Sequence, residues 1–288
     1  MINRKTAIGR QFNRSAAGSY DIHAHVQRIM ANKLVKSLEK WTYEGDSNRP
    51  DILEIGCGTG TLTEIVINQW PCLSITALDI APTMILAAEQ RVRSSAENNL
   101  CHNNRQPSCV HFLHADVEMW AANAPSSSFD LIISNACFQW LSRPKQTLEH
   151  LHRLLRTGGL LAFATFGPDT FRELHTAFDA VYRAGGMKPQ RHGLSFLTAD
   201  QWRNMLEETG FSNIQVERLL QTEEHASARD FLLSVKALGA STSEAASSHG
   251  FGSRRLFANM YKEYESKFST SGGVTATYDV LIIRASAI

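Results

Sequence analysis

The chain has 288 residues and a formal net charge of +1, from 29 Lys and Arg against 28 Asp and Glu. Its 43% hydrophobic and 20% charged residues are typical of a globular protein and exclude wholesale disorder. The near-neutral charge argues against nucleic acid as a partner, because polyanion binders usually carry excess positive charge. A local basic patch for an acidic protein partner is compatible with it.

The cysteine content favours a reducing compartment. Cysteine occurs five times, at Cys57, Cys72, Cys101, Cys109 and Cys137, and no pair has CxxC spacing. The odd number and the spacing argue against a disulfide framework and a zinc site. The first 20 residues contain no apolar core of signal-peptide length, and no apolar run approaches the roughly 18 to 20 residues of a membrane span. We therefore expect a soluble cytoplasmic protein with no membrane partner.

Strands and helices alternate through residues 20–166. An apolar stripe predicts a helix at 20–40, followed by a turn-rich linker at 42–50 and, later, a polar surface insertion at 93–108. We predict strands at 51–56, 74–79, 109–114, 129–134 and 160–166, and helices at 62–70, from 82 onward and at 145–155. This rhythm of βαβ units predicts an α/β, doubly wound, mostly parallel sheet with helices on both faces.

The second half departs from this rhythm. We predict helices at 168–182, 198–209, 229–238 and 254–268, and a flexible low-complexity stretch at 239–250. Strands are expected at 212–220 and 275–284. These two late strands would form an antiparallel edge on the parallel sheet.

A glycine loop, Gly56-Cys-Gly58-Thr-Gly60, follows the first predicted strand and precedes a helix. Glycines at such a place let the backbone turn sharply and approach a ligand, and the helix end offers free N–H groups. A plain strand-to-helix turn is the alternative. The spacing GxGxG differs from the GxGxxG of NAD enzymes.

Two acidic residues favour one ligand over another. Asp79 ends the second strand, 19 residues after Gly60, where a carboxylate can accept both ribose hydroxyls of a nucleoside. Its alternative role is a helix N-cap ahead of Pro82. Glu54 lies two residues before the first glycine, which is unfavourable for a pyrophosphate but favourable for the ammonium and sulfonium charges of S-adenosylmethionine. The sign of the charge therefore favours S-adenosylmethionine over NAD.

Polar residues also end the third and fourth strands. Asp116 is placed to hydrogen-bond an adenine amino group, or alternatively to cap a helix. Asn135 lies where the tip of the sheet would meet the methionine part of the ligand and the substrate. Phe138 and Trp140 are interpreted as pocket wall and packing.

The ordered segments ILEIGCGTG, ALDIAPTMI, HADVE, FDLIISNACFQW and LLRTGGLLAF resemble the motifs of class I S-adenosylmethionine-dependent methyltransferases. They cover about residues 50–166. The resemblance implies a Rossmann-like sheet of seven strands, the last antiparallel. It also implies that the cofactor is held by Glu54, Gly56, Gly58, Gly60, Asp79, Ile80, Asp116, Val117 and Asn135.

The flanking segments resemble a narrower family, the malonyl-acyl-carrier-protein O-methyltransferases of biotin synthesis. The segments are FNRSAAGSYDIHAHVQ, LLAFATFGPDTFREL, RHGLSFLTADQW and VTATYDVLIIRA. The resemblance implies a helical lid at 1–45 and a methyltransferase domain at 46–288, with a helical substrate insertion at about 167–210 after the fifth strand. It implies methylation of the free carboxylate of a malonyl thioester on acyl-carrier protein, or on coenzyme A, to prime pimeloyl synthesis.

Further site residues are expected on the lid and the insertion. Tyr20 is our main candidate for a donor that orients the carboxylate, with half-buried packing as its alternative. His23 and Gln27 share its helix face, and Arg14 is a candidate anchor for the carboxylate. Candidates for lining the substrate mouth are Gln139, Phe166, Asp169 and His192; no metal site is expected.

Basic residues cluster in two places, and either cluster is a candidate for docking an acidic carrier. One contains Arg183, Lys188, Arg191 and Arg203; the other contains Arg254, Arg255 and Lys262. A solvated surface is the alternative for both. Two other functions also stay open here, a carboxyl methyltransferase acting on a small free acid and a non-catalytic module that binds S-adenosylmethionine.

Overall fold

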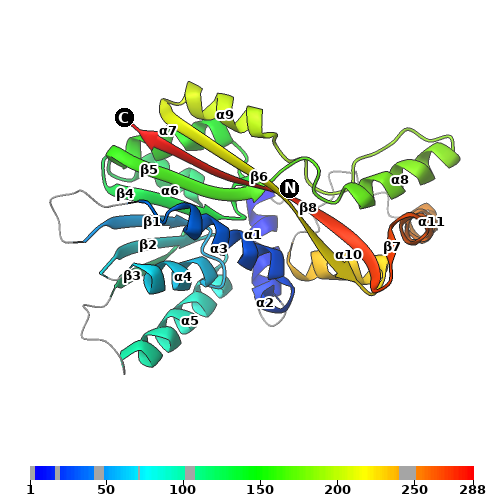
Figure 1. Cartoon of the computed structure of the whole chain (residues 1–288), viewed down its shortest axis with the longest axis horizontal. Coiled ribbons are helices and arrows are strands. Elements are labelled where there is room, and N and C mark those ends of the chain that lie inside the picture. Colours follow the sequence, from blue (N-terminus) through cyan, green and yellow to red (C-terminus); the bar gives the residue numbers. More distant parts are fainter. Residues whose placement is uncertain (1–3, 17–19, 42–48, 71, 101–107, 240–250) are drawn as a thin grey trace.

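The computed structural model describes residues 4–16, 20–41, 49–70, 72–100, 108–239 and 251–288. Cys101, the low-complexity residues 240–250 and most of the expected linker at 42–50 lie outside this part of the chain. A single sheet runs through the described structure (Figure 1), with the strand order β3-β2-β1-β4-β5-β8-β6. The predicted mostly parallel seven-stranded sheet is therefore confirmed, with the two-residue β7 paired to β8 in addition.

The first five strands are parallel, and β8 is antiparallel to both of its neighbours. Their bounds are β1 (Asp51–Ile55), β2 (Ser74–Asp79), β3 (Cys109–His114), β4 (Phe129–Asn135), β5 (Leu155–Phe166), β6 (Phe211–His225), β7 (Ser269–Thr270) and β8 (Gly273–Ala287). The central strands are buried on both faces, which their continuous apolar runs require. The carboxyl ends of β1, β2 and β4 consequently meet at one edge.

Helices cover both faces of the sheet. One face packs α6 (Val117–Asn123), α7 (Pro144–Leu154) and α9 (Ala199–Glu208). The other packs α3 (His25–Ser37), α4 (Thr61–Gln69), α5 (Pro82–Leu100), α8 (Arg172–Ala184), α10 (Ala228–Ala237) and α11 (Phe251–Phe268). The 15-residue strands β6 and β8 project beyond the others, and α8, α10 and α11 lie beside the projecting ends (Figure 1).

The structure differs from the sequence-based elements in three places. The expected helix at 20–40 is divided into α2 (Tyr20–His23) and α3, because Ala24 leaves helical geometry at ψ 33°. Residues 93–100, expected in a surface insertion, continue α5 instead. Residues 157–159, expected to precede the fifth strand, lie within β5, where the pairing with β4 shifts register.

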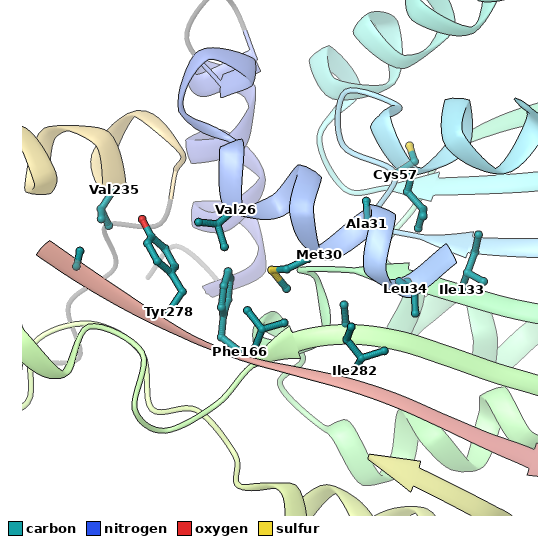
Figure 2. Close-up of a cluster of buried hydrophobic side chains, with 14 of the residues drawn as sticks. Val26, Met30, Ala31, Leu34, Cys57, Ile133, Phe166, Val235, Tyr278 and Ile282 are labelled. Atoms are coloured by element: carbon teal, nitrogen blue, oxygen red, sulfur yellow. The ribbon is translucent and has the colours of Figure 1, made fainter. Parts of the chain in front are cut away.

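Helix α3 is anchored in the hydrophobic core (Figure 2). Val26, Met30 and Leu34 recur along one face and are at most 1% exposed, packed in the same cluster as Ile133 of β4 and Ile282 of β8. Burying each such side chain stabilises the fold by about 1.5–3 kcal/mol. This packing fixes α2, which immediately precedes α3, above the carboxyl ends of the central strands.

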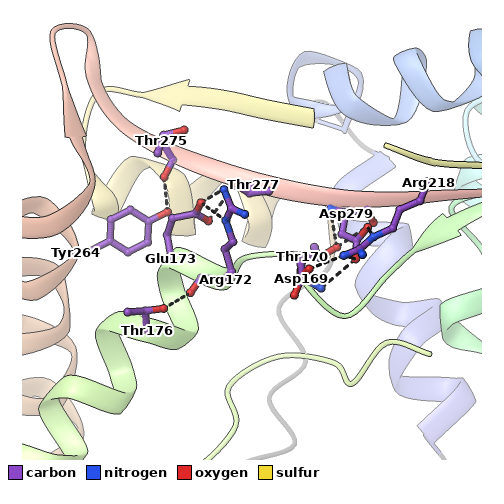
Figure 3. A network of polar contacts seen from close by, with 10 residues as sticks. All are labelled: Asp169, Thr170, Arg172, Glu173, Thr176, Arg218, Tyr264, Thr275, Thr277 and Asp279. Atoms are coloured by element: carbon purple, nitrogen blue, oxygen red, sulfur yellow. Dashed lines mark hydrogen bonds and ion pairs between the residues drawn. The ribbon is translucent and has the colours of Figure 1, made fainter. Parts of the chain in front are cut away.

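A polar network joins the segment after β5 to β8 (Figure 3). Arg218 of β6 donates from Nε and Nη2 to the two carboxylate oxygens of buried Asp279, at 2.7 and 2.9 Å, and also pairs with Asp169. One turn further, Glu173 of α8 accepts from the backbone N–H of Thr277 at 2.9 Å and from its hydroxyl. These bonds hold the start of α8 against the middle of β8.

Candidate active site

The loop between β1 and α4 requires its glycines for both conformation and packing. Gly56, Gly58 and Gly60 have φ of +71°, +54° and +84°, in the left-handed region that side chains disfavour. A Cβ on Gly56 would lie 2.5 Å from Sγ of Cys137, and one on Gly60 would lie 2.9 Å from Cα of Ala88. The loop is thus held closely against β4 and α5.

Asp79, the last residue of β2, organises this loop. Its Oδ2 accepts from the Gly58 N–H at 2.9 Å, and its Oδ1 accepts from the Ala81 N–H at 2.8 Å. Burial raises the pKa of Asp79, and the bonds from Ala81 and Gly58 oppose that rise. No Lys or Arg of the described residues forms an ion pair with it. A carboxylate has about four acceptor positions, so this one retains capacity for further donors.

Glu54 is a second buried acid without a cation. Its Oε2 accepts from the Thr63 hydroxyl at 2.6 Å, while its Oε1 is buried without a hydrogen-bond partner in the described structure. Burial raises the pKa of Glu54 to about 8. Leaving an acceptor unpaired costs free energy, so a buried orphan of this kind needs an explanation. A positively charged ligand nearby would supply one.

A cavity opens between the strand ends and helix α1 (Arg4–Ala16), with about 700 Å³ of empty space when the open solvent at its mouth is included. Its position outside the carboxyl ends of parallel strands is the usual ligand position of such sheets. The sheet side contributes Ile55, Gly56, Gly58, Leu78, Asp79, Ile80, Met84, Ala115, Asp116, Val117, Asn135, Ala136, Cys137, Trp140 and Leu141. The N-terminal helices contribute Lys5, Ile8, Phe12 and Tyr20.

Asp116 caps a helix, as one of its two interpretations from the sequence predicted, and its predicted bond to adenine stays a prediction. It caps α6, accepting from the Glu118 N–H at 3.1 Å, and it also lines the cavity. Lys5 of α1 reaches across to this wall, with its Nζ 2.6 Å from Glu118 and 3.5 Å from Asp116. An ion pair therefore holds α1 over the cavity.

The comparisons with known proteins agree with this site. The family model for methyltransferase domains matches residues 22–216. The chain is 58% identical to the malonyl-[acyl-carrier protein] O-methyltransferase of Paenibacillus sp. (strain JDR-2), over 99% of this chain and 100% of that one. It is 40% identical to the protein of the same name from Brevibacillus brevis, over 98% and 96%. The chain belongs to the malonyl-[acyl-carrier protein] O-methyltransferase family.

Solved structures place this family member in the predicted class I methyltransferase fold. A putative methyltransferase from Bacillus halodurans matches with a TM-score of 0.56 at 15% identity, covering 89% of this chain and 98% of that one. The N-methyltransferase NodS from Bradyrhizobium japonicum, in complex with S-adenosylhomocysteine, matches with 0.53 at 16%, over 97% of each. The methyltransferase is dependent on S-adenosylmethionine, as the cofactor motifs predicted.

Tyr20 of α2 belongs to the cavity wall of this methyltransferase. It lines the cavity together with Asp79 and Gly58. Burial, reinforced by the negative charges of Asp79 and Asp21, raises the pKa of the Tyr20 phenol far above its ordinary value. The hydroxyl therefore stays protonated and available as a donor.

Asn135, at the end of β4, links the cavity to the helix that follows Tyr20. Its Nδ2 donates to the Gln27 carbonyl at 2.9 Å, and its Oδ1 is buried without a hydrogen-bond partner in the part of the chain described. The side-chain Oε1 of Gln27 is likewise buried and unpartnered there, although Gln27 does not line the cavity. One orphaned acceptor thus belongs to a residue of the cavity wall, Asn135, and the other belongs to Gln27 behind it.

The other predicted lid residues lie outside the cavity of this methyltransferase. Arg14, in the last turn of α1, is exposed, and His23 is half-buried at the end of α2. Gly60 and Glu54 lie behind the lining residues rather than among them. The cavity therefore gathers Tyr20 and most of the predicted cofactor residues, but not the whole predicted lid.

The predicted substrate residues form a separate group toward the insertion. Gln139 donates to the Ala136 carbonyl at 2.6 Å and accepts from the Thr165 hydroxyl at 3.1 Å. Phe166 packs against Phe196, and His192 stacks on other aromatic residues of the insertion. None of the three predicted residues lines the cavity in the described structure.

Sequence reasoning predicted an N-terminal lid that includes Arg14 but missed the three residues of α1 that line the cavity. Lys5, Ile8 and Phe12 have the i, i+3, i+7 spacing of one helix face, which was the available signal. Phe12 meets Trp140 edge-to-face at a ring distance of 5.3 Å. Trp140 lines the cavity, while Phe138 stacks on Phe163, so both expected roles of these aromatics are present.

The described residues contain no cluster of His, Cys, Asp and Glu suited to a metal ion. Among the same residues, no helix is long and apolar enough to cross a membrane.

Proposed function

We propose that the protein transfers a methyl group from S-adenosylmethionine to the free carboxylate of malonyl-acyl-carrier protein. The product is a methyl ester that primes pimeloyl synthesis and hence biotin synthesis. The single observation that carries this proposal is a relative of that name, 58% identical over 99% of this chain. It favours the carrier-bound substrate over the small free acid.

The cavity residues fit the parts of S-adenosylmethionine. We assign the ribose hydroxyls to Asp79, whose carboxylate retains acceptor positions, and the adenine to Ile80, Asp116 and Val117. The methionine part belongs beside the glycine loop. There the raised pKa of Glu54 and its unpartnered Oε1 match an arriving positive charge.

The chemistry needs no general base. S-adenosylmethionine supplies an electrophilic methyl on a sulfonium, and a malonyl carboxylate oxygen displaces the thioether in line, without any proton transfer. A carboxylate is already ionised at neutral pH. The reacting charges cancel as the carbon–oxygen bond forms, so an apolar cavity wall of residues such as Ile8, Phe12 and Trp140 favours the step.

Tyr20 orients the carboxylate in this proposal. Its hydroxyl stays protonated, so it donates to one oxygen and leaves the other free to attack. The neighbouring residue Asp21 fixes its position, because Asp21 accepts from the Thr59 hydroxyl at 2.7 Å and from Arg91 at 2.6 Å. These bonds tie α2 directly to the glycine loop.

The remaining candidates keep a role on the substrate side. Gln139, Phe166 and His192 lie between the cavity wall and the insertion, where a thioester arm would approach. Arg14, His23 and Gln27 belong to the helices around Tyr20. We assign these six residues to substrate positioning.

The direct test is incubation with malonyl-acyl-carrier protein and S-adenosylmethionine, followed by mass spectrometry of the carrier. Addition of one methyl group that base hydrolysis removes supports the proposal, and no addition with an active control enzyme refutes it.

Tyr20→Phe tests the assigned donor. Removing one such donor lowers kcat by roughly 100-fold, while affinity for S-adenosylhomocysteine changes little. Tyr261→Phe on α11, outside the cavity lining, is the matched control and keeps full turnover. Unchanged kcat in Tyr20→Phe would reduce Tyr20 to a packing residue.

A further inference from the structure

Helices α8 and α11 bring two distant basic segments to one end of the molecule (Figure 1). The two helices pack antiparallel, because Phe178 meets Phe257 at a ring distance of 5.4 Å while Glu173 lies near Tyr264. The last turn of α8, with Arg183, is therefore next to the beginning of α11. The segments are about 70 residues apart in sequence, so only the fold unites them.

The surface there carries positive charge without compensation. We define the basic end as Arg183, Lys188, Arg191, Arg254 and Arg255. All five are exposed, and none forms an ion pair with a described residue. Residues 180–199 and 251–262 contain no Asp or Glu at all. Arg203 does not belong to this surface, since it donates to the Ile214 carbonyl at the β6 side.

The basic end is continuous with the mouth of the active-site cavity. Arg191 donates from Nε to the Leu194 carbonyl at 3.3 Å. Leu194 in turn packs with Ile8 and Trp140, which line the cavity. Three residues span at most about 11 Å of extended chain, so Arg191 and the cavity cover are close neighbours.

Aromatic residues follow the same path from the basic end to the sheet. His192 stacks on Phe178 at 3.7 Å and hydrogen-bonds the Tyr182 hydroxyl at 2.7 Å. Phe196, two residues after Leu194, meets Phe166 at a ring distance of 5.9 Å. The loop between α8 and α9 is thus held by aromatic contacts at His192, next to Arg191, and at Phe196, next to the sheet.

We propose that the basic end docks an acidic face of the carrier protein, so that its thioester arm enters the cavity along residues 186–198. This inference rests on the proposed function and adds the surface used. Complementary charge accelerates encounter and fixes orientation, while the arm itself makes the contacts at the reacting end. Because the whole chain has a net charge of only +1, the attraction of an acidic partner depends on this surface rather than on the overall charge.

The test compares two substrates that share the reacting group. The variant Lys188→Glu/Arg254→Glu/Arg255→Glu is assayed with malonyl-acyl-carrier protein and with malonyl-pantetheine, which lacks the protein part. We expect KM for the carrier substrate to rise by roughly tenfold or more with little change in kcat, and KM for malonyl-pantetheine to stay unchanged. Raising salt should increase the wild-type KM for the carrier and affect the variant less.

The matched control is Lys33→Glu/Lys36→Glu/Lys40→Glu, which makes the same charge change on three exposed lysines of α3 and the turn after it, away from the basic end (Figure 1). It should behave as wild type. An unchanged carrier KM in the basic-end variant, or equal rises with both substrates, overturns the proposal. If wild type methylates neither substrate, the proposed function fails. In that case, titration of the unloaded carrier into wild type and into the variant tests docking by itself. Binding by wild type and its loss in the variant support docking at the basic end.

Discussion

Two pairs of buried carboxylates in this protein are treated in opposite ways. At the strand ends, Glu54 and Asp79 are buried without an ion pair to a Lys or Arg of the described residues, and burial raises the pKa of both. At the projecting end of β8, Asp279 is bonded to Arg218, and Glu173 accepts from the Thr277 N–H and hydroxyl. The first pair has acceptor capacity left over, and the second is fully engaged.

The difference separates binding from scaffolding. An ionised group without a partner is costly to bury, so such groups persist where a ligand supplies the missing charge or donor. A carboxylate that already has its cation stabilises an arrangement of segments instead, here the junction of α8, β6 and β8. Buried acids of the same chain thus differ in role according to whether the protein itself supplies their partners.

The largest expected effect is on stability, at the engaged pair. Arg218→Met leaves Asp279 buried without its cation and should lower the free energy of unfolding by about 3 kcal/mol, the low end for a broken buried pair because Arg218 is half-exposed. Urea denaturation measures this, with Lys145→Met, from an exposed pair, as a control near zero. The Arg218→Met variant should keep its affinity for S-adenosylhomocysteine. If the variant loses affinity as well as stability, the two pairs of carboxylates do not have separate roles.

The next effect is on ligand affinity and concerns the carboxylates at the strand ends, which have no ion-pair partner. Asp79→Asn keeps the shape but removes the charge and one acceptor, and it should weaken S-adenosylhomocysteine binding by roughly 10- to 100-fold. Isothermal titration calorimetry measures this, with exposed Asp200→Asn as the control. The unfolding free energy should change little, because the removal of a buried charge offsets the loss of one of the two bonds from backbone N–H groups. Unaltered affinity would mean that Asp79 serves only the loop.

The smallest effect, counted per pH unit, is a pH dependence of the unfolding free energy from Glu54. With a pKa of about 8 against an ordinary 4.5, folded protein retains a proton that the unfolded chain loses between these values. The stability that the protonated Glu54 gives the folded protein is thus fully present below pH 4.5. It declines as pH rises toward 8, by about 1.4 kcal/mol per pH unit. Glu54→Gln should remove this slope, measured by urea denaturation at several pH values. Parallel wild-type and variant profiles would show that Glu54 is ionised throughout.

The sheet side of the cavity was predictable because its signals are local. The glycine loop, Asp79 and Asp116 each follow directly after a strand, so chain order alone places them at one edge. The sheet followed from the βαβ rhythm in the same way. Even the two interpretations of Asp116, helix cap and cavity wall, were both visible in its position before α6.

The other side depends on contacts between distant segments. Lys5 reaches Glu118 across more than 100 residues, and no spacing rule encodes that distance. The meeting of Arg183 with Arg254 likewise depends on how α8 packs against α11. At the break between α2 and α3, the apolar stripe continued through Ala24, so tertiary packing decided what periodicity could not. The proposed division into a lid at 1–45 and a domain at 46–288 stays a prediction.

The position of β8 has a consequence for how the chain acquires its structure. The last strand in the sequence lies between β5 and β6, and it is the antiparallel partner of both. During synthesis, β6 emerges more than 45 residues before the only main-sheet strand that pairs with it in the described structure. Completion of the sheet must therefore wait until β8 has left the ribosome. Until then, the edges of β5 and β6 that β8 will cover are exposed to pairing with wrong strands.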